Sequence, residues 1–209
     1  MIDMFDQTYR KILAVSASDA PTPGGGSVSA MVGALGVAMA AMVGNLTYGK
    51  PKYKDVEAEI KEITGQAYFI INRLEKLVAA DIAAFGKFMD VYKMPKNTDE
   101  EKAKREEAMQ KAMKVATNEP MEIARTLLDA LVIIEKLSKI GNKMAISDAG
   151  VAAYVCEAAV NAVLLSADIN IPMVKDQEFV AAVKEEKAKI VAEARRLKDQ
   201  AVATVNERM

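Results

Sequence analysis

The sequence predicts an all-α protein: a single-domain helical bundle over residues 1–209, with two core helices rich in Ala and Gly wrapped by long amphipathic helices. Apolar residues recur in steps of three and four along most of the chain, and no segment shows the period-2 alternation that is typical of strands. Two stretches, near Ala40 and near Ala158, consist mainly of small apolar residues, as expected of helices that pack closely at the centre of a bundle.

The sequence pattern in the first half of the chain predicts three helices. Apolar residues have helical spacing from Asp3 to about Ser16, where the turn-forming sequence SASDAPTPGGG interrupts the pattern. The first small-residue helix is expected to begin at Ser27. A long amphipathic helix is expected from Tyr53 onward, with Gly65 as a candidate kink position.

The middle of the chain predicts two charged or amphipathic helices. Pro95 interrupts the preceding pattern, and Asn97 or Thr98 is expected to cap a helix that has acids in its first turn. Pro120 is expected to open a separate helix, and Gly141 is expected to end it.

Two further helices complete the prediction. The second small-residue helix is expected from about Ala149 to Ala167, and Pro172 stops the chain again. A final charged helix is expected from about Gln177 to the end of the sequence.

The segment from Ser27 to Leu46 has no charged residue and has the length of a bilayer crossing, about 20 residues. It consists mostly of Ala, Gly, Val and Met, and no aromatic belt flanks both of its ends. We therefore expect a buried helix in a protein without a membrane span.

The composition excludes several classes of function. Lys and Arg number 28 and Asp and Glu number 29, and Trp is absent, so nucleic acid is not an expected partner. The sequence has no His, which removes imidazole as a general base and as a metal ligand, and no metal site is expected. The single Cys156 is expected to be a packing residue, and the acidic N-terminus lacks a secretory pattern, so we expect a cytoplasmic protein.

The sequence PTPGGGS places three glycines, Gly24, Gly25 and Gly26, directly before Ser27. Backbone amides in such a loop can approach a ligand closely, and the free N–H groups of the following helix favour an anion or a carbonyl oxygen. Ser27 would be the helix cap or a ligand contact. The alternative is a tight turn that only leads the chain into a crowded core.

Asp81 falls on the apolar stripe of its predicted helix, between Leu77 and Phe85. A carboxylate at a core position is costly unless it is paired, hydrogen-bonded or protonated, and enzymes use such burial to tune a general acid or base. The alternatives are a structural ion pair and a residue that sets the register of a helix interface.

Other polar residues are candidates for contacts with a ligand. In GNKMAISDAG, Asn142 and Asp148 could face a ligand, although Ser147 or Asp148 could equally cap the next helix. Lys50 and Lys96 lie beside predicted loops, where lysines are either solvated surface or an attraction for a substrate that carries carboxylates.

Several blocks of the sequence together resemble one family. PTPGGGSVSAMVGALG, MVGNLTYGKPKY, AADIAAF, MPKNTDEEKAKR, GNKMAISD and NIPMVKD occur in the same order as in the folate cyclodeaminase and cyclohydrolase family, from about Phe5 to Asp176. This family comprises formimidoyltetrahydrofolate cyclodeaminases, including the C-terminal half of the bifunctional formiminotransferase-cyclodeaminase, and stand-alone methenyltetrahydrofolate cyclohydrolases.

The resemblance implies an all-helical homodimer that binds folate between its helices and needs no cofactor beyond the tetrahydrofolate substrate. Asp81 matches the family's catalytic aspartate in the block Asp-x-x-Ala-Phe. The resemblance also implies a set of further residues that match the family's pocket motifs: Gly24, Gly25, Gly26, Ser27, Lys96, Asn142 and Asp148.

The sequence also departs from the family pattern. Ala79 occupies the place of a second acid that often precedes the catalytic one, so a paired-carboxylate mechanism is not supported. The family's Asn-Val-x-Ile-Asn-Leu segment is Ser166 to Ile171 here and keeps only the second Asn.

The resemblance implies hydrolysis of 5,10-methenyltetrahydrofolate to 10-formyltetrahydrofolate. Conversion of 5-formiminotetrahydrofolate to 5,10-methenyltetrahydrofolate and ammonia is the alternative, because both activities occur in the family. A helical ligand-binding or scaffold protein without turnover is the alternative of another class.

Overall fold

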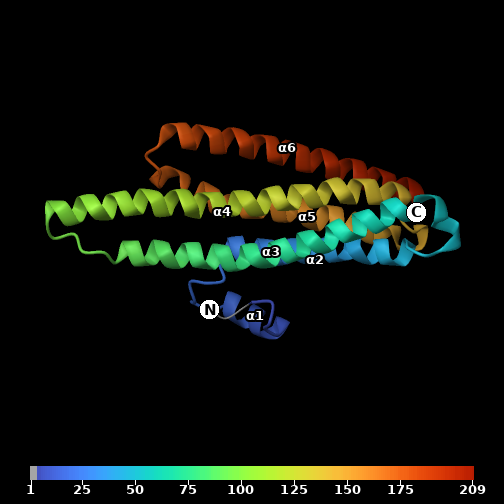
Figure 1. Ribbon diagram of the computed structural model, residues 1–209, viewed down its shortest axis with the longest axis horizontal. Coiled ribbons are helices and arrows are strands. Elements are labelled where there is room, and N and C mark those ends of the chain that lie inside the picture. Colours follow the sequence, from blue (N-terminus) through green and yellow to red (C-terminus); the bar gives the residue numbers. More distant parts are fainter. Residues whose placement is uncertain (1–3) are drawn as a thin grey trace.

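The computed structural model describes residues 4–209, and within that range it contains six α-helices, three short 3₁₀ helices and no strand (Figure 1). The all-α prediction is confirmed. The α-helices are α1 (Tyr9–Ser16), α2 (Gly25–Thr47), α3 (Glu57–Tyr92), α4 (Asp99–Ile140), α5 (Ile146–Asp168) and α6 (Gln177–Arg208). The 3₁₀ helices are η1 (Pro51–Val56), η2 (Lys143–Ala145) and η3 (Ile171–Met173).

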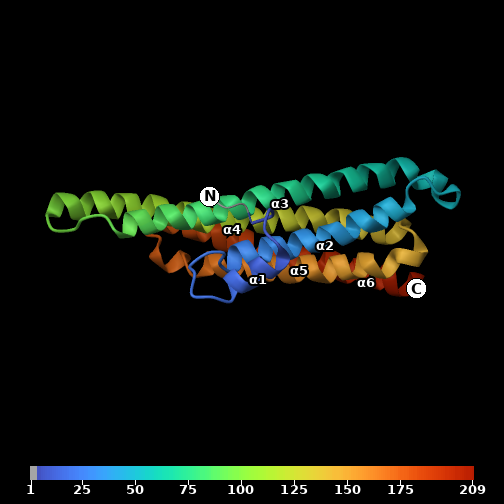
Figure 2. The same ribbon diagram turned by 90° about the horizontal axis from the view of Figure 1, so that it is seen from below.

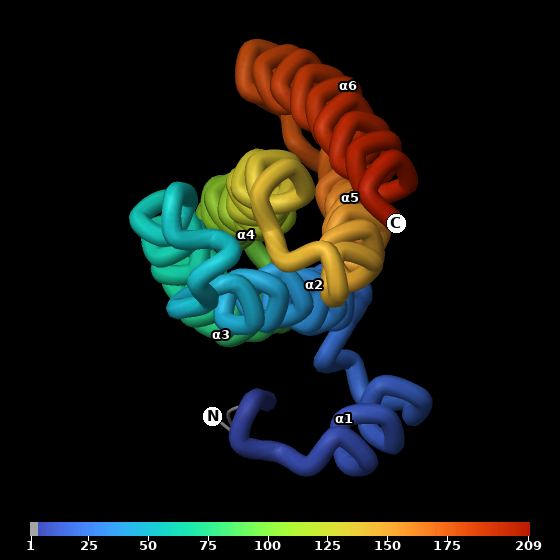
Figure 3. Tube along the Cα trace, turned by 90° about the vertical axis from the view of Figure 1, so that its right-hand side faces the viewer, coloured from blue at the N-terminus to red at the C-terminus, as the bar shows by residue number. Residues whose placement is uncertain are grey.

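Four of the helices form an elongated bundle. Seen end-on, α2, α3, α4 and α5 surround a common core, and α6 lies across the outside of α4 and α5 (Figure 3). The short α1 lies beside the bundle near α2 and has no buried residue (Figures 2 and 3). The buried apolar side chains of the bundle and of α6 form one continuous cluster.

The two small-residue helices, α2 and α5, pack against each other along their length, as the composition predicts. A methyl group added at Gly36 of α2 would lie 2.9 Å from the Sγ of Cys156 on α5, so only a glycine allows the two backbones this approach. Cys156 is fully buried, and burial raises its pKa to about 12. Its predicted role as a packing residue agrees with this environment.

Gly44 marks a similar close approach between α2 and α3. A methyl group at this position would overlap the Oγ1 of Thr64, a buried side chain that donates a hydrogen bond of 2.7 Å to the carbonyl of Ile60. Gly44→Ala is expected to lower the free energy of unfolding by about 1–3 kcal/mol through overpacking, measured by urea denaturation. The matched control is Gly65→Ala on α3, where nothing lies within 4 Å of the added methyl group and a gain of about 0.4–1 kcal/mol is expected. Equal effects of the two substitutions would contradict this description of the interface.

Two segments, Gly25–Thr47 and Lys143–Met173, have the length and hydropathy of a membrane-crossing helix. In the bundle, 61% of the most apolar window of the first segment and 50% of that of the second are buried. This burial agrees with the prediction that the small-residue helices form the core.

The sequence predicted that Pro120 opens a helix. The structure instead places Pro120 inside the continuous 42-residue α4. Proline has no N–H, so it cannot bond to the carbonyl four residues earlier, that of Ala116. The side-chain amide of Asn170 donates a 2.9 Å hydrogen bond to this carbonyl and another, of 3.0 Å, to the carbonyl of Ser166. A residue from the segment after α5 therefore replaces the missing helical hydrogen bond.

The starts of three other helices differ from the prediction. The first helix begins at Tyr9, where Thr8 caps it, while Asp3 lies outside the described residues. The second begins at Gly25, before the predicted Ser27. The long amphipathic helix is preceded by η1 and begins at Glu57, and it continues as one α-helix through the candidate kink position.

The remaining helix ends are set by local hydrogen bonds. Neither Ser147 nor Asp148 caps α5, which follows directly on η2 and begins at Ile146. Thr98 caps α4 in a capping box with Glu101, which confirms one of the two predicted caps. Gly141 ends α4 as predicted.

Candidate active site

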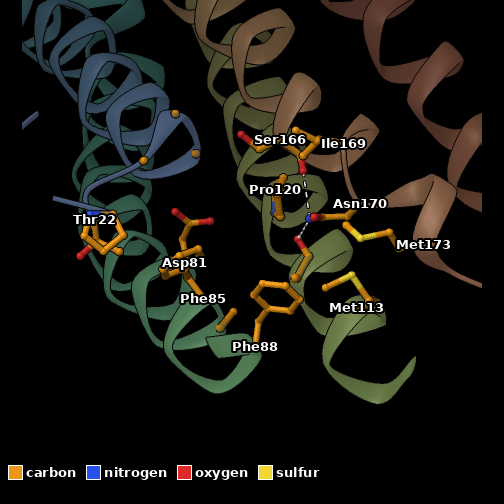
Figure 4. Close-up of a pocket in the computed structure, with 16 residues that line it drawn as sticks. Thr22, Asp81, Phe85, Phe88, Met113, Pro120, Ser166, Ile169, Asn170 and Met173 are labelled. Atoms are coloured by element: carbon orange, nitrogen blue, oxygen red, sulfur yellow. Dashed lines mark hydrogen bonds between the residues drawn. The ribbon is translucent and has the colours of Figure 1, made fainter. Parts of the chain in front are cut away.

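A pocket of about 290 Å³ lies at the end of the bundle where α2 begins and α5 ends (Figure 4). The first turn of α2 and the preceding loop form one wall, α3 and α4 form the base, and the end of α5 with η3 forms the opposite wall. Its lining is mainly apolar, with a few polar groups that include one carboxylate. The side chains from α3, α4 and the far wall are Asp81, Ala84, Phe85, Phe88, Met113, Ala116, Pro120, Ser166, Ile169, Asn170 and Met173.

Asp81 extends from α3 toward the N-terminus of α2. The hydroxyl of Ser27 donates a 2.6 Å hydrogen bond to its Oδ2. A methyl group at Gly26 would lie 2.7 Å from Oδ1, so the carboxylate occupies the space that this glycine leaves free. The carboxylate thus lies against the positive end of a helix dipole, an arrangement that favours negative charge there.

The glycines do not form the predicted loop, because Gly24 is the N-cap of α2 and Gly25 and Gly26 belong to its first turn. All three line the same pocket as Asp81. Ser27 is fully buried and contacts the carboxylate itself.

Burial is the largest influence on Asp81 and raises its pKa above the ordinary value of 3.8, while the side-chain and backbone hydrogen bonds from Ser27 oppose the shift. Asp81 makes no ion pair within residues 4–209, which disfavours the alternative of a structural ion pair. Burial and the Ser27 hydrogen bonds thus act in opposite directions on a carboxyl group that can accept a proton as a carboxylate and donate it once protonated.

A second carboxylate, Glu119, lies on α4 near Asp81. Its pKa is raised by burial and by the charge of Asp81, and the nearby Lys87 opposes this shift. In this chain, Ala79 occupies the position of the family's second acid, and Ala79 is exposed on α3. The structure therefore has a neighbouring acid that comes from another helix.

Asp81→Asn is expected to stabilise the folded protein at neutral pH. Because burial raises the pKa of Asp81 in the folded state, the folded chain holds this proton more tightly than the unfolded chain does. The stabilisation that this tighter proton binding gives the folded state is therefore complete below the ordinary pKa of 3.8. It is lost as pH rises through the raised pKa of Asp81. Asn has no charge to desolvate, so the Tm difference between variant and wild type should grow as pH rises above 3.8. A Tm difference independent of pH would contradict the burial described here.

The far wall of the pocket depends on Asn170, a residue that motif reasoning left in doubt. Its amide holds the Ala116 carbonyl that Pro120 leaves free, and this fixes the end of α5 against α4 (Figure 4). The signals in the sequence were the proline inside a helical pattern and the single Asn kept from the family segment.

Three predicted binding residues lie at the other end of the bundle. Lys50 follows the C-terminal end of α2, Asn142 follows α4, and Asp148 is in the first turn of α5. Since α2 has 23 residues, this end is about 30 Å from the pocket. A single chain does not bring these residues to Asp81.

Asn142 has a structural role at that end. Its Oδ1 accepts hydrogen bonds from the hydroxyl of Tyr53 and from the backbone N–H of Met144, and its Nδ2 donates to the carbonyl of Leu46. Its backbone N–H bonds to the hydroxyl of Thr47. These bonds join the ends of α2 and α4, which explains Asn142 without a ligand.

Lys96 lies in the connection between α3 and α4, which projects beyond the other helices at one end of the bundle (Figure 1). It is exposed and does not line the pocket. No group of three His, Cys, Asp or Glu side chains arranged to hold a metal ion occurs within residues 4–209.

Comparison with known proteins gives consistent relatives. Residues 8–189 match the family model described as formiminotransferase-cyclodeaminase. The chain is 37% identical to methenyltetrahydrofolate cyclohydrolase of Methylorubrum extorquens, over 98% of both chains. It is 30% identical to formimidoyltransferase-cyclodeaminase of Rattus norvegicus over 192 residues and spans 36% of that protein. The crystal structure of formiminotetrahydrofolate cyclodeaminase from Thermotoga maritima superposes with a TM-score of 0.87 at 30% identity, over 97% of this chain and 98% of that one.

Proposed function

We propose, given that the chain belongs to the formiminotransferase-cyclodeaminase family, that it hydrolyses 5,10-methenyltetrahydrofolate to 10-formyltetrahydrofolate. The observation that carries this proposal is the Asp81 carboxyl group, held by Ser27 at the N-terminus of α2 and facing an apolar pocket. The relative named as a cyclohydrolase is 37% identical to this chain, whereas the Thermotoga maritima cyclodeaminase of similar coverage is 30% identical, which supports this choice between the two family activities.

The proposed chemistry begins with a water molecule held by Asp81. As the water oxygen bonds to the cationic methenyl carbon, one of its protons passes to the carboxylate. The bond from that carbon to N5 then breaks, N5 takes the proton back from Asp81, and the new hydroxyl loses its proton to solvent as the formyl C=O forms. The sum is one water consumed and one proton released.

The walls of the pocket fit a flat, partly apolar substrate. Phe85 and Phe88 lie on one side with ring centroids 6.3 Å apart, and Met113, Ile169 and Met173 lie opposite (Figure 4). These side chains also keep bulk water from the carboxyl group, which strengthens its interaction with a cationic carbon.

The test is to give the purified protein 5,10-methenyltetrahydrofolate and 5-formiminotetrahydrofolate separately, following the methenyl chromophore and released ammonia. Loss of chromophore from the first substrate supports the cyclohydrolase. Appearance of chromophore with ammonia from the second identifies a cyclodeaminase. Neither signal in folded protein would overturn both activities and leave the scaffold alternative.

Cyclodeaminase activity is the second candidate, favoured by the superposition with the Thermotoga maritima enzyme. In that reaction N10 attacks the formimino carbon, and protonated Asp81 would supply the proton with which ammonia leaves. The two reactions require opposite protonation states. Cyclohydrolase rates should rise with pH through the raised pKa of Asp81, whereas cyclodeaminase rates should fall.

An exposed apolar face on α2 and α5 supports a homodimer. Leu35 on α2 is 58% exposed, Leu165 on α5 is 67% exposed, and Ile169, which directly follows α5, is 72% exposed. No charged residue occurs on α2, so the face is suited to self-association. The exposed apolar residues of this face are Val32, Leu35, Leu46, Val151, Tyr154, Leu165 and Ile169.

Light scattering coupled to size exclusion tests the dimer. Leu35→Glu should convert a dimer to a monomer, because it places a charge in the middle of the face. Phe69→Glu on α3, at a side chain that is 66% exposed elsewhere, is the control and should remain dimeric. A monomeric wild type, or a dimeric Leu35→Glu variant, would overturn the proposed interface.

We also propose that the reaction needs no cofactor beyond the tetrahydrofolate substrate and that it occurs in the cytoplasm. Water and a carboxyl group suffice for the proposed steps. Full activity after dialysis against EDTA is the expected result. A loss of activity that added Zn²⁺ or Mg²⁺ reverses would overturn the proposal that no cofactor is needed.

A further inference from the structure

The far wall of the active-site pocket has a hydrogen-bond acceptor with a fixed direction. Asn170 donates both of its amide hydrogens, one to the carbonyl of Ala116 at 2.9 Å and one to the carbonyl of Ser166 at 3.0 Å. These two carbonyls fix the orientation of the amide, because only its NH₂ group can face them. The Oδ1 of Asn170 accepts no hydrogen bond within residues 4–209 and is not buried, so it is open to a ligand in the pocket.

The hydroxyl of Ser166 is a second open group on the same wall. It makes no hydrogen bond in the part of the chain that the structure describes, and it is also accessible. Ser166 and Asn170 are four positions apart at the end of α5, so they lie on one side of this turn (Figure 4). A hydroxyl that can donate therefore lies beside an oxygen that can only accept.

These two groups belong to a row of polar groups that ends at Asp81. The Oγ of Ser166 lies 3.6 Å from the position that a Cβ at Gly25 would occupy. The Oδ1 of Asp81 lies 2.7 Å from the corresponding position at Gly26. The order around the pocket is thus Asn170, Ser166, the first turn of α2, and Asp81 (Figure 4).

The pterin of a tetrahydrofolate carries complementary groups in the same order. Its N3–H is a donor, and the adjacent C4=O is an acceptor. N5 follows on the same side of the ring system and carries the one-carbon unit. When this unit lies at Asp81, as the proposed reaction requires, C4=O is directed toward Ser166 and N3–H toward Asn170.

We infer that Asn170 and Ser166 recognise the lactam edge of the pterin: the Oδ1 of Asn170 accepts from N3–H, and the hydroxyl of Ser166 donates to C4=O. This inference rests on the proposed function. The apolar side chains of Phe85, Phe88 and Met113 contact the flat faces of the ring and cannot distinguish one edge from another. The two polar groups therefore determine how the ring is turned, and with it which atom meets Asp81.

The inference predicts discrimination against a 4-amino-4-deoxy pterin. In that analogue an NH₂ group replaces C4=O, and N3 carries a lone pair in place of its hydrogen. Ser166 can rotate its hydroxyl and accept from the new NH₂ group, but the fixed Oδ1 of Asn170 faces the lone pair of N3. Leaving these two polar atoms without partners should weaken binding about tenfold to a hundredfold.

The experiment measures the dissociation constants of 5-formyltetrahydrofolate and of its 4-amino-4-deoxy analogue by isothermal titration calorimetry. The wild type should bind the first compound more tightly by the factor just given. The double variant Pro120→Ala/Asn170→Leu should bring the ratio to about one, because Leu has a similar size and no acceptor. Pro120→Ala supplies an N–H for the carbonyl of Ala116, so the helix keeps a hydrogen bond where Asn170 is lost. Pro120→Ala alone is the matched control and should keep the wild-type ratio.

Ser166→Ala tests the second contact without disturbing the fold, since this hydroxyl makes no hydrogen bond within residues 4–209. It should weaken binding of 5-formyltetrahydrofolate about threefold to tenfold, the usual effect of one neutral hydrogen bond. Ser147→Ala removes an exposed hydroxyl at the opposite end of the same helix and should bind as the wild type does.

The outcomes separate the inference from the function it rests on. Equal dissociation constants in the wild type, or a double variant that keeps the wild-type ratio, overturn the role of Asn170. Unchanged binding by Ser166→Ala overturns the role of Ser166. Loss of the methenyl chromophore, followed with the same proteins, tests hydrolysis separately. A wild type that shows the binding ratio without turnover overturns the proposed function and keeps the lactam site, whereas a wild type that binds neither compound overturns both.

Discussion

Asp81→Asn is expected to lower kcat for hydrolysis of 5,10-methenyltetrahydrofolate by about 10²–10⁴-fold, the usual contribution of a positioned general acid or base. Asn has the size of Asp and can still accept the hydrogen bond from Ser27, but it cannot take a proton from water. KM should change little, because the apolar walls of the pocket remain. The measurement is the initial rate of loss of the methenyl chromophore.

The control is Asp90→Asn, which removes an exposed carboxylate of the same helix away from the active-site pocket. It should retain wild-type kcat. Thermal melting of Asp81→Asn separates lost chemistry from lost structure, because this variant is expected to be more stable than the wild type at neutral pH. A folded Asp81→Asn protein with more than a tenth of wild-type kcat would contradict the role given to this carboxylate.

Gly26→Ala is the second substitution with a large expected effect. The new methyl group would lie 2.7 Å from Oδ1 of Asp81, closer than such atoms can approach, so the carboxylate must move and its bond to Ser27 must lengthen or break. A displacement of about 1 Å at a reacting group costs on the order of 10²-fold in rate. We expect a loss of kcat of that size, measured in the same assay.

The neighbouring substitution Gly25→Ala is the comparison, since its methyl group would meet the Oγ of Ser166 at 3.6 Å, an ordinary contact. The kcat of Gly25→Ala should be at least tenfold higher than the kcat of Gly26→Ala. Similar losses in both variants would indicate that the whole first turn of α2 is sensitive, rather than the space beside Asp81.

Much of the fold was predictable because helical periodicity is a local property of the sequence. The small-residue stretches around Ala40 and Ala158 identified the two core helices, and Thr98 and Gly141 identified two helix ends. Pro120 was misread as a helix start, because the bond that compensates for it comes from Asn170, in a distant part of the chain. Local rules contain no such partner.

The site was predictable where a residue conflicted with its surroundings. Asp81 was recognisable as a charge on an apolar stripe, and the glycines were recognisable as an unusual run. Lys50, Asn142 and Asp148 could not be placed from the sequence, because a motif does not reveal at which end of a long helix it will lie. The structure places these three about 30 Å from Asp81.

The hydrogen bond from Asn170 to Ala116 has a consequence for the order in which the molecule is made. The chain is synthesised from its N-terminus, so α2, α3 and α4 exist before the segment that carries Asn170 leaves the ribosome. Until then the carbonyl of Ala116 has only water as a partner, and the wall that Ser166 and Ile169 contribute is missing. A nascent chain can thus bury part of its core while it still lacks a binding cavity, and competence for substrate arises only once the segment that carries Asn170 has emerged.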